Sequence, residues 1–197
     1  MAKLLNWANF ARKLGKNPVF TPLDVRRAFG VSRQTATLAL HRYGKRSLIE
    51  RLKKGLYAFP GSSFSDPYLA NRLYSPSYVS LEFALSYHGV IPETVYTITS
   101  VTPKATRTFT VRAKTFSYHR IKAEAFTGYK VEKQGGLSFY IADPEKAFVD
   151  LTYLRLRSGV KPLNRFRKEK LNVLKTLRYA HLFGNPKLIA VVKRTLR

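Results

Sequence analysis

The stretch "GVSRQTATLALHRYGKRS", residues 30–47, decides the fold of the N-terminal part of the chain. Gly30 allows a tight turn, and Ser32 is a residue type that caps helix N-termini. The apolar residues that follow lie at i, i+4 and i+7 on one helical face: Ala36, Leu40 and Tyr43. The stretch therefore predicts a capped helix with one face buried in a core.

The opposite face of this predicted helix, and the turn after it, carry polar and basic side chains. Such side chains can reach base edges and phosphates when a helix lies in the major groove of DNA. We expect DNA contacts from Arg33, Gln34, Thr35, Thr37, His41, Arg42, Lys45 and Arg46. For His41, contact with backbone or water is a better expectation than contact with a base. On a neutral chain, exposed residues of these types are usually only solvated.

Two more helices are predicted before this one. Apolar residues at spacings of three and four indicate a first helix that ends near Gly15. A second helix begins after Thr21, whose hydroxyl can cap it, and runs to Phe29. Together with the helix after Ser32, these elements predict a three-helix unit.

A basic hairpin is predicted after the three helices. The run "SLIERLKKGLYAF" indicates strands at 48–52 and 56–59, joined by a turn of Lys53, Lys54 and Gly55. This order of elements is the layout of a winged helix-turn-helix, in which the third helix enters the groove. We therefore expect Lys53 and Lys54 to lie along DNA phosphates.

The charge of the chain favours a polyanionic partner. Its 197 residues contain 36 Lys and Arg against 11 Asp and Glu, a net charge of +25 that exceeds what solubility requires. Residues 1–60 hold 13 basic and 2 acidic side chains, residues 61–154 hold 10 and 8, and residues 155–197 hold 13 and 1. Because the charge is concentrated in the two end segments, nucleic acid is the expected partner.

The sequence shows no pattern typical of a metal-binding protein, a membrane protein or an enzyme. The chain has no cysteine and its four histidines show no ligand spacing, so neither a metal nor a cofactor is expected. No stretch approaches the roughly 18 apolar residues of a membrane span, and we expect a cytoplasmic protein without membrane contact. The sequence shows no nucleophile with a base and no phosphate loop, so no catalytic residue is predicted. Three acidic residues are expected as helix cap, helix-dipole partner and helix surface: Asp143, Glu145 and Asp150.

The loop "FPGSSFSDP" at 59–67 separates a first domain, residues 1–62, from a second, residues 63–197. In the second, Ser80 is expected to cap a helix over 81–88. Strands are expected at 95–101, 107–111, 116–120 and 137–141. The predicted fold class is α+β: a winged helix-turn-helix followed by a mixed α/β domain with basic C-terminal helices.

Three stretches of the second domain resemble the AbiEi antitoxin family. They are "SYVSLEFALSYHGVIPETVYTITSVT" at 77–102, "TFSYHRI" at 115–121 and "IADPEKAFVDLTYL" at 141–154. Members of that family are transcriptional regulators paired with nucleotidyltransferase toxins in abortive-infection systems. The resemblance implies an N-terminal domain that binds operator DNA in its own promoter, and a C-terminal domain that counters the toxin.

The segment after residue 154 is expected to be helical and basic. A helix over 163–184 would bury a stripe of leucines, and a last helix is expected over 187–196. Its cations would form either a second surface for DNA or a contact with an acidic toxin: Arg165, Arg167, Lys168, Lys170, Lys175 and Arg178. Basic residues alone do not choose between these partners.

The expected function is that of a non-enzymatic antitoxin and autorepressor that binds double-stranded DNA. One alternative is a stand-alone DNA-binding regulator without a toxin. A second is an RNA-binding module. RNA readers often carry exposed stacking aromatics on a sheet, whereas the aromatics of this chain fall mostly on expected core positions.

Overall fold

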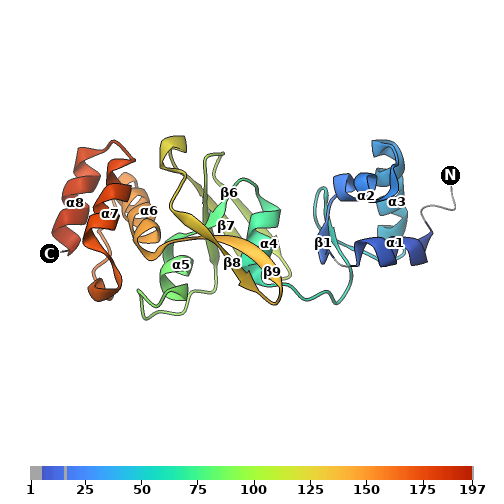
Figure 1. Cartoon of the computed structure of the whole chain (residues 1–197), viewed down its shortest axis with the longest axis horizontal. Helices are drawn as coiled ribbons and strands as arrows, with labels where there is room; N and C mark the ends of the chain where they lie inside the picture. The colour runs from blue at the N-terminus through green and yellow to red at the C-terminus, as the bar shows by residue number, and fades with distance from the viewer. Residues whose placement is uncertain (1–5, 16, 197) are drawn as a thin grey trace. The chain divides into compact units, whose positions relative to one another are not determined.

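The structure, a computed structural model, describes residues 6–15 and 17–196. The chain divides into two compact units, one ending at Ser65 and the other beginning at Asp66 (Figure 1). The described residues form eight α-helices and two sheets. Each unit combines helices with a sheet of its own, so the predicted α+β class is confirmed.

Unit 1 consists of three helices and a small antiparallel sheet. In chain order its elements are α1 (Trp7–Leu14), β1 (Val19–Phe20), α2 (Pro22–Phe29), α3 (Arg33–Lys45), β2 (Glu50–Lys53) and β3 (Leu56–Ala58). The strands are ordered β1-β3-β2. Strands β2 and β3 follow α3 and form a hairpin, and β3 also pairs with β1, which lies before α2.

Local side-chain caps fix where α2 and α3 begin. Thr21 and Asp24 form a reciprocal capping box at the start of α2, and Gly30 ends that helix in the left-handed conformation with φ of 63°. The Ser32 hydroxyl accepts the N–H of Thr35 at 3.1 Å and caps α3. These three sequence-based predictions are confirmed.

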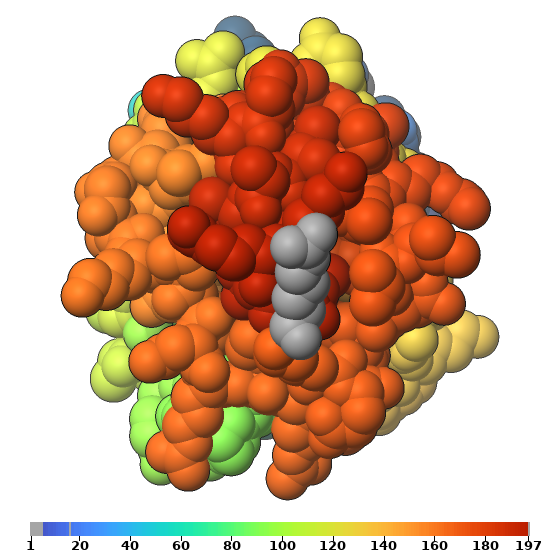
Figure 2. Space-filling model, turned by 90° about the vertical axis from the view of Figure 1, so that its left-hand side faces the viewer, coloured from blue at the N-terminus to red at the C-terminus, as the bar shows by residue number. Residues whose placement is uncertain are grey.

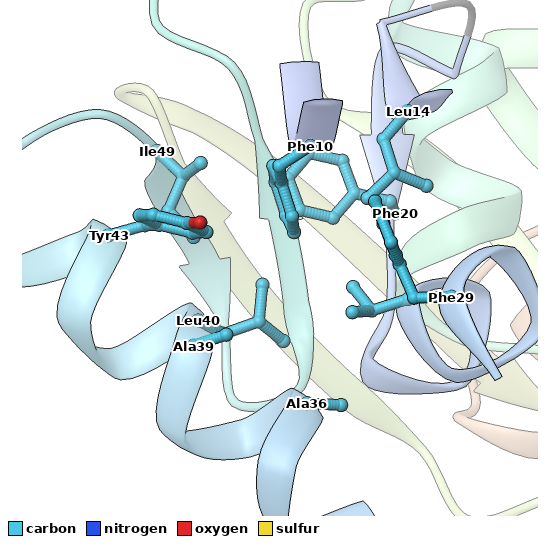
Figure 3. Packing of buried hydrophobic residues seen from close by; sticks show 10 residues of the cluster. Phe10, Leu14, Phe20, Phe29, Ala36, Ala39, Leu40, Tyr43 and Ile49 are labelled. Atoms are coloured by element: carbon cyan, nitrogen blue, oxygen red, sulfur yellow. The ribbon is translucent and has the colours of Figure 1, made fainter. Parts of the chain in front are cut away.

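The core of unit 1 is a cluster of aromatic rings around Phe10 (Figure 3). Its ring centroid lies 4.8 Å from that of Tyr43 and 5.9 Å from that of Phe29. The residues that α3 buries are Ala36, Ala39, Leu40 and Tyr43. The predicted inward face of α3 is therefore confirmed, and the helix is held by one side only.

The hairpin strands span Glu50–Lys53 and Leu56–Ala58, whereas strands at 48–52 and 56–59 were predicted. Lys53 belongs to β2, where it pairs with Leu56, and is half-buried. Only Lys54 and Gly55 form the turn, and Gly55 has a φ of 79° that suits glycine. The prediction that placed Lys53 in the turn was wrong, because backbone pairing continued one residue further than the hydrophobic pattern indicated.

Unit 2 is a six-stranded mixed sheet with helices on both faces. Its elements are α4 (Asp66–Leu73), β4 (Tyr78–Val79), α5 (Leu81–Tyr87), β5 (Ile98–Thr102), β6 (Arg107–Val111), β7 (Lys114–Arg120), β8 (Tyr129–Gln134), β9 (Leu137–Ala142), α6 (Pro144–Arg157), α7 (Val173–His181) and α8 (Pro186–Leu196). The strand order is β6-β7-β5-β4-β9-β8. The sequence did not predict α4, β4 or β8, which are short or lack strict alternation.

Helices α4 and α6 reach opposite faces of this sheet. The Tyr118 hydroxyl donates to the carbonyl of Ala70 in α4, and the Tyr78 hydroxyl donates to Asp150 in α6. Tyr118 pairs with Ser100 while Tyr78 pairs with its neighbour Val101. Because consecutive strand residues point to opposite faces, the two tyrosines lie on opposite faces.

A fully buried ion pair ties α6 to the sheet. Lys146 and Asp150 are both 0% exposed and pair across one helical turn, and Asp150 also accepts hydrogen bonds from the hydroxyls of Tyr78 and Ser80. The Lys146 ammonium lies 4.9 Å from the ring centroid of Phe183. Asp150 was predicted on the helix surface, and that prediction was wrong because this set of partners compensates its burial.

Ser80 also departs from its predicted role. It precedes α5 in the capping position, but its hydroxyl makes no capping hydrogen bond and donates to Asp150 at 2.9 Å. The capping hydroxyls of α2 and α3 bind residues three positions along the chain, whereas the Ser80 hydroxyl binds a residue 70 positions away. The N–H of Phe83 in the first turn of α5 is accepted instead by the hydroxyl of Thr99, at 3.1 Å.

The C-terminal helices differ from the single helix predicted over 163–184. A 3-10 turn spans Lys168–Lys170, and α7 begins only after Asn172, whose side chain accepts the N–H of Lys175 at 2.9 Å. The side chains that α7 buries are the small ones, Thr176 and Ala180, whereas Leu174 is 77% exposed. The prediction of a buried leucine stripe was therefore wrong at Leu174 and at Leu182, which is also exposed. Helix α8 buries Leu188 and Val192.

We expect Asp150→Ala to lower the free energy of unfolding by about 3–5 kcal/mol, because it leaves the Lys146 ammonium buried without its counterion. The double variant Lys146→Met/Asp150→Leu should cost clearly less, since it removes both charges. Chemical denaturation followed by circular dichroism measures both. A loss below about 1 kcal/mol for Asp150→Ala would contradict the buried-pair assignment.

Candidate nucleic-acid interface

The outward face of α3 forms a single stripe along the helix. Gln34, Leu38, His41 and Lys45 follow one another at i, i+4, i+7 and i+11, and all four side chains are exposed. This stripe lies opposite the buried residues that hold α3 on the core. Because the helix is capped and packed on its inner side, the stripe projects from a rigid support.

A groove of about 700 Å³ runs between α3 and the β2–β3 hairpin. From α3 it is lined by Arg33, Thr37, His41 and Lys45, and from the hairpin by Arg51 and Lys54. Its floor includes Leu40, Ile49 and Tyr57. Two separate elements therefore direct cations into one groove. None of the described residues that line it is acidic.

Most of the residues predicted on α3 lie at this surface. Arg33 and Thr37 border the groove and also a smaller hollow that they share with Gln34 and Leu38. The Thr37 hydroxyl donates to the carbonyl of Arg33 at 2.9 Å, so it can only accept a hydrogen bond from a ligand. Arg33 and Gln34 remain exposed and suited to base edges or phosphates.

Thr35 is the one predicted contact on α3 with a local structural role instead. It is half-buried, and its hydroxyl lies 2.9 Å from the Ser32 hydroxyl in the helix cap. The cap therefore occupies the group that was expected to contact DNA.

Arg42 and Arg46 lie near the C-terminal end of α3, outside the groove. Both are exposed, and their charges lower the pKa of Tyr43, which burial nevertheless raises above its usual value. Neither lines the groove, so a role on flanking phosphates fits them better than contact with bases.

Two residues at this surface were missed by sequence reasoning. Arg51 lines the groove from β2, and Leu38 is 62% exposed on the central stripe of α3. Arg51 could have been found from its alternation with the buried Leu52 in a strand. Leu38 gave no signal, because an isolated leucine on a helix is ordinarily assigned to a core.

The six predicted C-terminal cations fall into three different segments of unit 2. Arg165 and Arg167 lie in the chain before the 3-10 turn, Lys168 and Lys170 within it, and Lys175 and Arg178 on α7. Figure 2 shows the end of unit 2 where α7 and α8, in orange and red, form the surface. The cations belong to that part of the unit but not to one helix face.

Half of these six cations already have partners. Arg165 lies 3.7 Å from Glu93, and the Lys170 ammonium donates to the carbonyl of His88 at 3.2 Å. Lys175 lies 2.9 Å from Asp143 and 3.1 Å from Glu145. Within the described part of the chain, no ion pair or side-chain hydrogen bond involves the remaining three: Arg167, Lys168 and Arg178.

Lys175 joins α7 to the start of α6 through its ion pairs with Asp143 and Glu145. Asp143 makes no capping bond in α6. Its carboxylate instead pairs with Lys175 and accepts the Tyr179 hydroxyl at 2.8 Å. Burial by itself would raise the pKa of Asp143, but these two hydrogen bonds hold it below its usual value. Burial and the bond to Asp143 raise the pKa of Tyr179 to about 12.

The acidic and histidine side chains of unit 2 do not gather into one cluster. A His88 ring nitrogen lies 2.8 Å from the carbonyl of Ala142, and Glu93 faces Arg165. Burial lowers the pKa of His119, while the nearby Glu82 raises it. Over residues 6–15 and 17–196, no three His, Cys, Asp or Glu side chains are placed to hold a metal ion. No helix in these residues is long and apolar enough to cross a membrane.

No protein-family model matches the chain, and no curated protein matches it significantly.

We expect Lys175→Gln to lower the free energy of unfolding at pH 7 by roughly 0.5–1 kcal/mol, because partial exposure screens the pair with Asp143. The pKa of Asp143 is depressed in the folded state, so this stabilisation is present above its unfolded pKa of about 3.9 and is lost as the pH falls through the folded pKa. The difference between variant and wild type should therefore shrink as the pH falls below about 3.9.

The matched control is Arg178→Gln on the same helix, which should leave stability unchanged at every pH. Urea denaturation at several pH values measures both variants. A pH-independent effect of Lys175→Gln would show that its pairing with Asp143 does not stabilise unit 2.

Proposed function

We propose that the chain binds double-stranded DNA in a sequence-specific manner and that unit 1 is a winged helix-turn-helix. One observation carries this proposal: the groove into which α3 and the β2–β3 hairpin both direct cations, without an acidic residue among those described in its lining. A polyanion that contacts a helix and a hairpin together is the ligand that this arrangement suits.

The order and dimensions of the elements support the same proposal. Three helices and then a hairpin follow one another in unit 1. The 13 residues of α3 extend about 20 Å, and the major groove of DNA, about 12 Å wide, admits an α-helix. In this arrangement the N-terminal half of α3 meets base edges, and the hairpin lies along the adjacent phosphates.

The roles of the groove residues follow from their chemistry. Arg33 and Gln34 have planar groups that can bond two base atoms at once, as Arg does with guanine and Gln with adenine. Arg51 and Lys54 on the hairpin would neutralise phosphates, as would Lys45 further along α3. Base contacts then select the site and phosphate contacts supply most of the affinity.

The resemblance of residues 75–155 to AbiEi antitoxins supports a more specific proposal. The bound DNA would be the promoter of the chain's own operon, and repression would follow from blocking polymerase there. Unit 2 would counter a cognate nucleotidyltransferase toxin, with the cytoplasm as the place of action. A stand-alone regulator is the rival, and a nucleotidyltransferase encoded next to this gene would distinguish the two.

The three unpaired cations Arg167, Lys168 and Arg178 extend the proposal to unit 2. Residues 155–197 contain 13 basic and 1 acidic side chain, about as large an excess as in the N-terminal 60 residues. So much like charge favours a polyanion, because unpartnered it would destabilise the compact state. We assign these cations to flanking DNA phosphates, with the toxin as the competing partner.

A second candidate function, RNA binding, is favoured by one feature of the sheet. Ten of the 26 aromatic side chains are buried, whereas Tyr129 and Tyr140 are exposed together with Val131 on β8 and β9. The rings of Tyr129 and Tyr140 lie 5.6 Å apart, centroid to centroid. Exposed aromatics on neighbouring strands are a platform on which unpaired bases can stack.

The test of the DNA proposal begins with sites selected from a random duplex library. Arg33→Ala/Gln34→Ala should reduce the ratio of affinities for the selected site and for random DNA, by about 1–3 kcal/mol for each bidentate base interaction that the variant cannot form. Fluorescence anisotropy measures this ratio. The control Arg12→Ala, on α1, should leave it unchanged. An unchanged affinity ratio in the double variant would exclude α3 as the element that reads the bases. If a single-stranded oligonucleotide competes as well as the selected duplex, RNA binding would be favoured.

The phosphate contacts are tested by the salt dependence of binding. Arg51→Ala/Lys54→Ala should weaken all duplexes equally and reduce the slope of log K against log salt by about 2, because two fewer counterions are released. Arg167→Ala/Lys168→Ala/Arg178→Ala should reduce it by about 3 if unit 2 contacts DNA. An unchanged slope in the triple variant would assign those cations to another partner.

A further inference from the structure

The base-reading surface of α3 contains one side chain that neither its polar surroundings nor the core explains. Leu38 is 62% exposed and shares a shallow hollow with Arg33, Gln34 and Thr37. It occupies the centre of the outward stripe, between Gln34 one turn before it and His41 one turn after. On the helix face proposed to enter the major groove, an apolar side chain meets base edges, where an apolar group is its favourable counterpart.

Resting on the proposed DNA-binding function, we infer that Leu38 reads a thymine by contact with its C5-methyl group. In the major groove, the thymine methyl is the apolar group that a base pair presents among donors and acceptors. Leu38 lines the same hollow as Gln34 and Arg33, so it lies beside the base edges that they contact. It therefore discriminates thymine from the other three bases without a hydrogen bond.

The position of the thymine follows from helix geometry. Four residues separate Leu38 from Gln34, a rise of about 6 Å along α3, whereas successive base pairs are about 3.4 Å apart. The methyl group that Leu38 contacts therefore lies within about two base pairs of the base that Gln34 reads. A selected site should contain a thymine within that distance of the position whose preference Gln34→Ala relaxes.

Replacing thymine by deoxyuridine tests the contact, because it removes the methyl group and keeps every hydrogen-bonding atom of the base. Each thymine of a site selected with the full-length protein is replaced in turn. We expect one replacement to weaken binding about three- to tenfold, as removal of a buried methyl group does, and the others to have little effect. Fluorescence anisotropy at constant salt measures the change.

Variants of the protein assign that penalty to Leu38. The deoxyuridine penalty should disappear in Leu38→Ala, which lacks the contacting group, and should persist in Leu23→Ala. Leu23 is the matched control, since it is an exposed leucine of the same unit but lies on α2. Because both leucines are exposed, neither substitution opens a cavity in the core.

The outcomes separate this inference from the function on which it rests. If selection enriches a site but no deoxyuridine replacement weakens binding, or the penalty persists in Leu38→Ala, the thymine contact is overturned and DNA binding by α3 stands. If Leu38→Ala changes only the oligomeric state, the thymine contact is likewise overturned and Leu38 belongs to a contact between protein copies. If selection enriches no sequence, both proposals fail.

Discussion

The packing of Phe10 against rings from four other segments is the constraint on which the candidate interface depends. Its ring lies within 6.2 Å, centroid to centroid, of Phe20, Phe29, Tyr43 and Phe59. Tyr43 is the only one of these on α3, and it sets the rotation of that helix about its axis. A rotation of one residue position, about 100°, would bury part of the polar stripe and expose the alanines. The direction in which α3 presents its side chains is thus decided by the core beneath it.

Unit 2 relies on a different kind of interaction. The side chains of Asp150 and Lys146 are fully buried, and two hydroxyls complete the partners of the carboxylate. Burial raises the pKa of Asp150 and lowers that of Lys146, and their mutual attraction opposes both shifts. Such a pair contributes less to stability than apolar residues of the same size would, but its directional bonds tolerate few alternative packings. It joins α6, β4 and the residue before α5 in one arrangement.

Cations with and without a carboxylate partner would contribute differently to DNA binding. A lysine held by two carboxylates, as Lys175 is, would release few counterions on binding DNA, since its charge is already neutralised. Cations that line an open groove, such as Arg33 and Lys54, keep that capacity. Net charge therefore indicates the class of partner, whereas the pattern of ion pairs determines which residues contribute to binding.

The sequence by itself determined those features that depend on neighbours a few residues apart. The caps at Thr21 and Ser32, the left-handed Gly30 and the inward face of α3 are local, and each was predicted. The AbiEi resemblance and the proposed partners remain predictions from sequence. Only the tertiary structure decided the burial of Asp150, the pairing of Lys175 with Asp143, and the exposure of Leu38. Each of these depends on residues distant in the chain, because the fold alone determines which side chains meet and which are left facing outward.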